Sequence, residues 1–175
     1  MKIYTQMILM FLMSVVAHAE AKVAIKANSG RFEITQEHKD DFIERIKFSN
    51  PEKATIQLAG FSWAGHYSIS PDEKWIFRTQ KVGSGASIAI LYKVEENGRV
   101  SEVVHFNEAL WEVAVKYNHY KNEELYHKAI RKASWSEGGK LLELTLSGTN
   151  TKKTDDHLKI DLTYNLQTNS VSVVE

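Results

Sequence analysis

Three side chains of this sequence have the spacing of metal ligands on a helix. His119, Glu123 and His127 lie four residues apart, so a continuous helix would align them on one face, and imidazole and carboxylate groups bind divalent metals. Asn122, however, has the character of a new start, and Tyr126 opens a segment that resembles a strand. Because a broken helix cannot align the three groups, we interpret them as solvated polar side chains and expect no metal site.

A hydrolytic site is the second chemical possibility. His119, His127, Asp155 and His157 could supply a general acid and a general base if the C-terminal strands bring them together. The loop Gly83-Ser84-Gly85-Ala86-Ser87 lacks both the G-x-S-x-G elbow of serine hydrolases and the lysine of a phosphate-binding loop. We interpret it as a strand connection, so no catalytic residue is assigned and a small periplasmic hydrolase remains an alternative function.

Four aromatic residues give the best indication of binding. Trp111, Tyr117, Tyr120 and Tyr126 occur within one short stretch among asparagine and histidine residues, a mixture suited to protein contacts or to sugar stacking. The alternative interpretation is that Trp111 and Tyr117 belong to the core and Tyr120 to its rim. We take the four as candidate binding residues for an unknown protein partner, with a carbohydrate-binding module as an alternative.

The N-terminus has the pattern of a secretory signal peptide. Lys2 precedes an apolar run from Met7 to Ala17, and Ala17 and Ala19 form an A-x-A cleavage pattern. The run covers about half of the roughly 20 residues of a membrane-spanning helix. We therefore predict cleavage after Ala19, no stable membrane insertion of the mature chain, and a periplasmic or secreted bacterial protein.

Composition narrows the class further. The sequence has no Cys, which excludes a disulfide framework and thiol catalysis, so the exported chain must be stabilised by its core. Lys and Arg balance Asp and Glu at 22 each, and this balance gives no indication of a nucleic acid partner. No sequence pattern implies a cofactor. A chain of this length can form a single domain over residues 20–175.

Two segments, about 55–104 and 126–175, repeat one order of four strands. Their clearest shared mark is the turn before the second strand, Ser70-Pro71-Asp72-Glu73-Lys74 in the first and Ser136-Glu137-Gly138-Gly139-Lys140 in the second. Aligning the turns pairs Trp75 with Leu141, whereas aligning the alternating apolar faces pairs it with Leu142. A shift of one residue reverses every side chain, so burial of both faces would be needed to reconcile the two alignments.

These turns resemble the S-P-D-G-K turn of β-propeller repeats of the kind found in TolB-like and WD40-like proteins. The resemblance implies four-stranded blades and carries no functional residue with it. Because a closed ring takes four to eight blades, we predict a mainly β fold with one or two short helices, in which two four-stranded antiparallel blade-like meanders pack together without forming a closed propeller.

Two helices are expected outside the units. Thr35 could cap a short helix with Phe42, Ile43 and Ile46 as its buried stripe, ending at Asn50-Pro51. Segment 106–121 fits either a helix or a strand, and we favour a helix because Asn107 could cap it and Glu112 lies four residues before Lys116. Export, modest size and the lack of a recognisable active site together favour a non-catalytic binding module, inhibitor-like or immunity-like, in the bacterial envelope.

Overall fold

The computed structural model describes residues 22–58, 60–153 and 155–174, so the predicted signal peptide 1–19 lies outside the described residues. Over these residues the chain is mainly β, with one α-helix, α1 (Phe106–Tyr117), and the short 3-10 turns η1 (Asn122–Glu124) and η2 (Glu137–Gly139). The strands are β1 (Lys22–Lys26), β2 (Phe32–His38), β3 (Phe42–Phe48), β4 (Ile56–Gln57), β5 (His66–Ile69), β6 (Trp75–Gly83), β7 (Ala86–Val94), β8 (Val100–Glu102), β9 (Leu125–Trp135), β10 (Leu141–Asn150), β11 (His157–Asn165) and β12 (Ser170–Val173).

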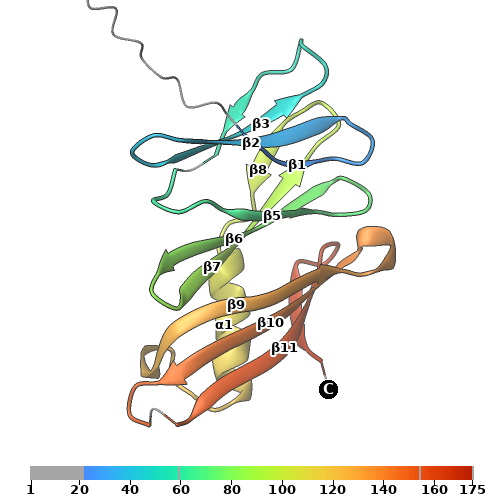
Figure 1. Cartoon of the computed structure of the whole chain (residues 1–175). Helices are drawn as coiled ribbons and strands as arrows, with labels where there is room; N and C mark the ends of the chain where they lie inside the picture. Colours follow the sequence, from blue (N-terminus) through green and yellow to red (C-terminus); the bar gives the residue numbers. More distant parts are fainter. Residues whose placement is uncertain (1–21, 59, 154, 175) are drawn as a thin grey trace, which may run out of the picture.

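The strands form three antiparallel sheets of four strands each: sheet A (β1 to β4), sheet B (β5 to β8) and sheet C (β9 to β12). Each sheet is a simple meander, and Figure 1 shows the three stacked in chain order along the length of the molecule. The described strands close neither a barrel nor a ring. The predicted mainly β class, with blade-like meanders that do not close a propeller, is therefore confirmed.

Sheet A corrects the prediction for the N-terminal third. The helix expected after Thr35 is wrong, because this segment forms β2 and β3, which pair from Phe32 with Phe48 to His38 with Phe42. The acidic residues Glu37, Asp40 and Asp41 are also typical of a helix start, but they lie at this hairpin, where the Glu37 carboxylate pairs with Arg45 at 3.0 Å. The structure thus has three meanders, where the sequence predicted two.

The first predicted unit also begins later than expected. The start predicted near residue 55 is wrong, since β4 pairs with β3 and belongs to sheet A, whereas β5 pairs with β6 and opens sheet B. The segment between β4 and β5 therefore connects two sheets.

One turn recurs at the same place in all three sheets. In each copy the N–H of the first residue donates to the carbonyl of the sixth over 3.0 Å: Ala27 to Phe32, Ser70 to Trp75 and Ser136 to Leu141. The fourth position has a left-handed backbone in each copy: Gly30 at φ 74°, Glu73 at φ 55° and Gly139 at φ 67°. The alignment of the internal repeats identified this turn in sheets B and C only, and sheet A has a third copy of it.

The arrangement of the sheets resolves the conflict between the two alignments. Ile76 packs in the core between sheets A and B, whereas its neighbour Phe77 packs in the core between sheets B and C. Strand β6 is thus buried on both faces, while in β10 Leu142 is buried and Glu143 is exposed. Alignment by the turns is correct, because it pairs Ile76 with Leu142, and each of these packs towards the preceding sheet.

The two ends of the stack are polar. When the three sheets are aligned by their turns, Ile34, Phe77 and Glu143 occupy equivalent positions on the face directed towards the following sheet. Ile34 and Phe77 are buried, whereas sheet C has the exposed Glu143 there. The equivalent positions directed towards the preceding sheet are those of Glu33, Ile76 and Leu142. Ile76 and Leu142 are buried, whereas sheet A has the charged Glu33 there. Repeat proteins end in units with a polar outer face, so three meanders can form a soluble stack without closing a ring.

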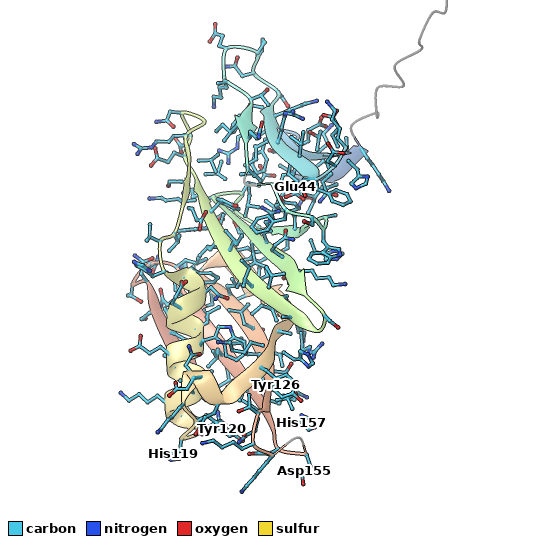
Figure 2. The ribbon with its side chains drawn as sticks, turned by 90° about the vertical axis from the view of Figure 1, so that its left-hand side faces the viewer. Glu44, His119, Tyr120, Tyr126, Asp155 and His157 are labelled. Carbon is cyan, nitrogen blue, oxygen red and sulfur yellow. The ribbon has the colours of Figure 1, made fainter. Side chains whose placement is uncertain are left out.

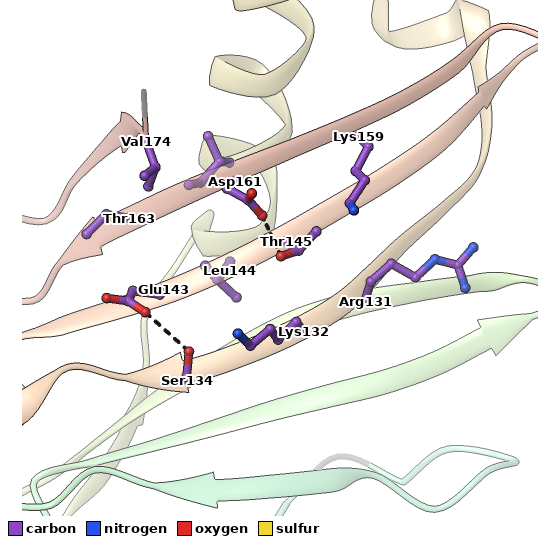
Figure 3. Close-up of a pocket in the computed structure, with 11 residues that line it drawn as sticks. Arg131, Lys132, Ser134, Glu143, Leu144, Thr145, Lys159, Asp161, Thr163 and Val174 are labelled. Carbon is purple, nitrogen blue, oxygen red and sulfur yellow. Dashed lines mark hydrogen bonds between the residues drawn. The ribbon is translucent and has the colours of Figure 1, made fainter.

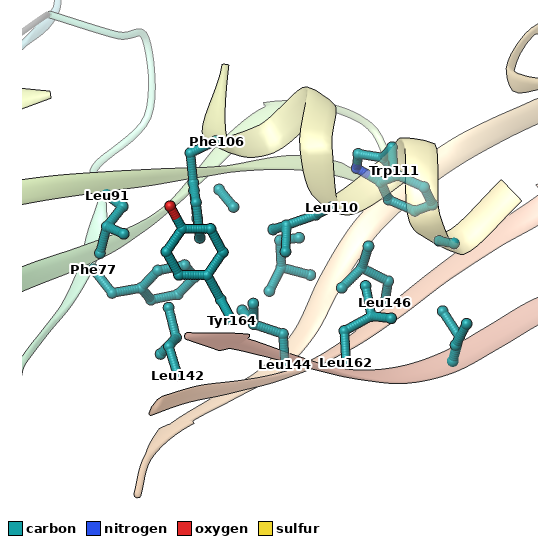
Figure 4. Close-up of a cluster of buried hydrophobic side chains, with 14 of the residues drawn as sticks. Phe77, Leu91, Phe106, Leu110, Trp111, Leu142, Leu144, Leu146, Leu162 and Tyr164 are labelled. Atoms are coloured by element: carbon teal, nitrogen blue, oxygen red, sulfur yellow. The ribbon is translucent and has the colours of Figure 1, made fainter. Parts of the chain in front are cut away.

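Helix α1 joins sheets B and C from the side. It packs against β7, β11 and β12, which confirms the helix favoured for segment 106–121, although it ends at Tyr117. Its buried residues are Phe106, Leu110, Trp111 and Ala114. They enter the larger core cluster together with residues of β6, β7, β10 and β11 (Figure 4).

Sheets A and B share a buried ion pair as well as an apolar core. The side chains of Glu44 and Arg78 are both fully buried and in contact. The Glu44 carboxylate also accepts from Gln36 Nε2 at 2.7 Å, from the Gly65 N–H at 2.8 Å and from the Tyr67 hydroxyl at 2.5 Å. Burial raises the pKa of Tyr67, so this phenol stays protonated and can donate. The carboxylate is thus surrounded by donors.

Glu73 departs from the glycine of the propeller turn because it links two sheets. Its carboxylate accepts from the Ser29 N–H at 2.7 Å and from the Ser29 hydroxyl at 2.5 Å, and Arg31 donates to its carbonyl. Partial burial opposes ionisation of this carboxyl, but the bonds from Ser29 and the charge of Arg31 prevail and lower its pKa.

We expect Glu73→Gln to reduce the acid sensitivity of the fold. A lowered folded-state pKa means that the carboxylate stabilises the protein above its unfolded pKa, about 4.3, and that this contribution is lost as the pH falls through the folded value. Urea midpoints at pH 7 and pH 3 should therefore differ less for Glu73→Gln than for the wild type. Glu52→Gln, at an exposed position, is the control, and equal pH responses of wild type and Glu73→Gln would contradict the prediction.

Candidate functional site

The four aromatic candidates occupy different environments. Trp111 is buried at 4% exposure, with Lys128 Nζ 5.6 Å from its ring centroid, whereas Tyr117 is 54% exposed at the end of α1. Tyr120 and Tyr126 are partly buried, and the Tyr126 ring lies 4.4 Å from that of His127. Trp111 is therefore a core residue, and the three tyrosines are the members of the set that a partner could contact.

Figure 2 shows Tyr120 and Tyr126 at the end remote from Glu44, together with His119, Asp155 and His157. We call the surface formed by residues 117–127, 150–153 and 155–157 the distal end. It comprises the chain from the end of α1 to the start of β9 and the hairpin between β10 and β11. Sequence reasoning thus selected residues that do lie in one region.

The two segments of the distal end are fastened to each other. The Tyr120 hydroxyl donates to Asp156 Oδ1 at 2.5 Å, and Asn150 Nδ2 donates to Asp156 Oδ2 at 3.1 Å. This bonding raises the pKa of Tyr120 and lowers that of Asp156, so the pair keeps a neutral phenol and an ionised carboxylate. Lys152 Nζ reaches Glu124 Oε1 at 2.8 Å. Side-chain contacts therefore join the two segments.

The residues of the hydrolase alternative are only partly brought together. His127 and His157 line one pocket, but neither His119 nor Asp155 is among its lining residues. His119 follows α1, Glu123 lies in η1 and His127 in β9, so the helical alignment required for a metal site does not occur. Among the described residues no group of three or more His, Cys, Asp or Glu side chains is placed to hold a metal ion.

The glycine-bearing loop is the tip of the β6–β7 hairpin, as a strand connection requires. The Ser87 hydroxyl accepts from the Ile130 N–H at 2.9 Å, so it joins sheet B to sheet C. Gly85 lies against His127, to the extent that a Cβ there would stand 3.4 Å from the imidazole Cγ. The loop therefore packs on the neighbouring sheet.

The outer face of sheet C is a further candidate binding surface, which the sequence analysis did not select. Side chains of β9, β10 and β11 line an open groove of about 550 Å³, among them the cations Arg131, Lys132 and Lys159 (Figure 3). Its acids are bonded to hydroxyl groups: Thr145 donates to Asp161 at 2.5 Å and Ser134 to Glu143 at 3.4 Å. The alternation of charged and apolar residues along β10 and β11 was the available sequence signal.

Comparison with known proteins adds no assignment to this geometry. Over the described residues no helix reaches the length and hydropathy that a membrane-spanning segment requires. No protein-family model matches the chain, and no curated protein matches it significantly.

Proposed function

We propose that this protein is an exported, non-catalytic binding module that recognises another protein through its distal end, as an inhibitor or immunity-type factor of the bacterial envelope would. The observation that carries the proposal is Tyr117, a large aromatic side chain left 54% exposed next to two fastened segments. Exposed tyrosines in a defined setting are the anchors that protein interfaces favour.

The charges around the tyrosines fit a protein partner. Exposed Lys121 and Lys153 stand beside exposed Glu123 and Asp155, so the two signs are mixed around the aromatic residues. Protein interfaces commonly combine aromatic anchors with a polar rim. A polyanion would instead be bound by a surface with one sign of charge.

Rigidity supports the same proposal. The bonds from Tyr120 to Asp156 and from Lys152 to Glu124 join the two segments in the unbound protein. Binding then has less conformational entropy to overcome, because preorganised contacts need little ordering on association. Preorganised side chains at the distal end therefore favour its use as a surface that recognises a partner.

We expect Tyr117→Ala to reduce partner capture at least tenfold. Loss of an aromatic anchor commonly costs 2 kcal/mol or more of binding free energy, and about 1.4 kcal/mol corresponds to a factor of ten. The measurement is quantitative affinity capture from envelope extracts on mature protein beginning at Glu20, followed by binding assays with the purified partner.

Val104→Ala is the matched control, because Val104 is 74% exposed but lies before α1 and outside the distal end. It should leave capture unchanged. Recovery of no specific partner, or equal capture by Tyr117→Ala and wild type, would refute the proposed surface.

A further inference from the structure

We propose that a pocket at the edge of the distal end, which shares His127 and His157 with it, binds an oxyanion group, a phosphate or a sulfate, either free or carried by a larger molecule. The pocket has a volume of about 300 Å³ and lies at one end of the outer face of sheet C. The lining side chains that carry the argument are His127, Arg131, Ser147, Thr149, His157 and Lys159. The inference does not depend on the proposed protein partner.

The charge of this pocket is unbalanced. No acidic residue lines it. No carboxylate of the described residues lies within ion-pair distance of Arg131 or Lys159. Asp161 lines the adjoining groove and accepts from the Thr145 hydroxyl, whereas Asp156 accepts from the Tyr120 hydroxyl and the Asn150 amide. Two cations therefore line the pocket, and neither is in an ion pair with a carboxylate of the described residues.

Irregularities of β9 direct two of the lining residues. Lys132 pairs with Thr145 and Ile130 with Leu146, which leaves Arg131 as an extra residue in the ladder. A second shift places His127 and Lys128 opposite Gly148 alone. Bulges commonly redirect a side chain next to a functional site, and here two bulges in one strand bring Arg131 and His127 to the same pocket.

The backbone of His127 is itself unusual. Its φ of 50° lies in the left-handed region, which residues other than glycine rarely adopt. The centroid of its imidazole lies 4.4 Å from that of the Tyr126 ring, and the ring lies against Gly85 of the β6–β7 hairpin. Non-glycine residues held in such conformations cluster at ligand sites, and His127 lines the pocket.

The donors suit a tetrahedral oxyanion. Arg131 Nε is bonded to the Ser147 hydroxyl at 2.6 Å, which holds the guanidinium in place and leaves its terminal nitrogens for a ligand. A guanidinium matches two phosphate oxygens, and Lys159 adds a point charge. Imidazole groups and the Thr149 hydroxyl can bond further oxygens. Several donors around one small cavity match a group that has oxygens in several directions.

The test is titration of purified mature protein with sodium phosphate, sodium sulfate and glucose 6-phosphate at constant ionic strength, with glucose as a blank, followed by calorimetry and by the imidazole NMR signals. We expect saturable binding that Arg131→Gln with Lys159→Gln weakens at least tenfold. His127→Asn should weaken it at least threefold, because asparagine tolerates the left-handed backbone but lacks the imidazole. The control Arg45→Gln with Lys47→Gln removes two cations from sheet A and should bind as wild type.

Two outcomes would overturn the inference: no saturable binding of any of the three anions, or equal affinity of wild type and the Arg131→Gln, Lys159→Gln protein. Tenfold tighter binding of glucose 6-phosphate than of inorganic phosphate would support a ligand that carries the group as an ester. Equal affinities would support the free anion. Thermal melts of each variant verify folding, and the His127→Asn protein keeps the test valid if the double variant is unstable.

Discussion

Arg78→Met is expected to lower the free energy of unfolding by about 3 to 5 kcal/mol, because breaking a buried ion pair leaves an uncompensated charge. The charge left behind would be Glu44, whose side chain is fully buried between sheets A and B. Methionine approximates the volume of the arginine stem, so the cavity is small and the loss reports mainly on charge. Urea denaturation of wild type and variant at pH 7 measures it.

Arg45→Met is the internal control. Arg45 follows Glu44 on the opposite face of β3 and pairs with Glu37 at the surface, with its side chain 29% exposed. Such pairs contribute about 0 to 1 kcal/mol. Glu44→Gln combined with Arg78→Met should recover part of the loss, since no buried charge then remains. A loss for Arg78→Met no larger than that for Arg45→Met would contradict the prediction.

The buried pair also accounts for how sheet A is positioned on sheet B. An apolar core tolerates small displacements, whereas Glu44 must meet Arg78, the Gly65 N–H and Tyr67 together. The guanidinium carbon further lies 4.6 Å from the ring centroid of Phe61. Without the pair, the two sheets should be able to shift relative to each other, because the remaining contacts are less directional. Their association should also be weaker.

Sheets B and C were predictable from sequence because local patterns determine their strands. The alternation of Leu142, Leu144 and Leu146 and the proline-bearing turn at Ser70 identify strand and hairpin without tertiary information. Sheet A was not recognised as a repeat, because its turn begins with alanine and because Glu37, Asp40 and Asp41 are typical of a helix start. Only pairing with a neighbouring strand distinguishes the two, and that pairing is a long-range property.

The distal end was partly predictable for a similar reason. A concentration of tyrosines within ten residues is visible in the sequence. Tyr120 and Tyr126 lie at one end of the fold (Figure 2), and Tyr117 ends helix α1 three residues before Tyr120. The oxyanion pocket was not predictable. Arg131 and Lys159 come from different strands, and the bulges that redirect β9 depend on its register with β10. Side chains at irregular positions break the alternation on which a strand pattern relies.

Phe106→Ala is expected to lower the free energy of unfolding by about 3 to 5 kcal/mol, the usual cost of truncating a buried phenylalanine. Phe106 is 3% exposed at the start of α1. Its ring stands edge-on to Tyr164 of β11, 4.8 Å away, and to Phe77 of β6, 6.4 Å away. The truncation removes contacts to two sheets at once, and the cavity cannot collapse without moving one of them.

Val104→Ala separates this effect from any change near the helix start. Val104 lies two residues earlier and is 74% exposed, so its truncation should change stability by less than about 0.5 kcal/mol. Thermal and urea denaturation of the two variants measure the difference. A loss below about 1 kcal/mol for Phe106→Ala would show that sheets B and C do not depend on α1 to hold them together. The expected larger loss would instead establish the helix as part of the shared core, because the ring that links Phe77 to Tyr164 belongs to neither sheet.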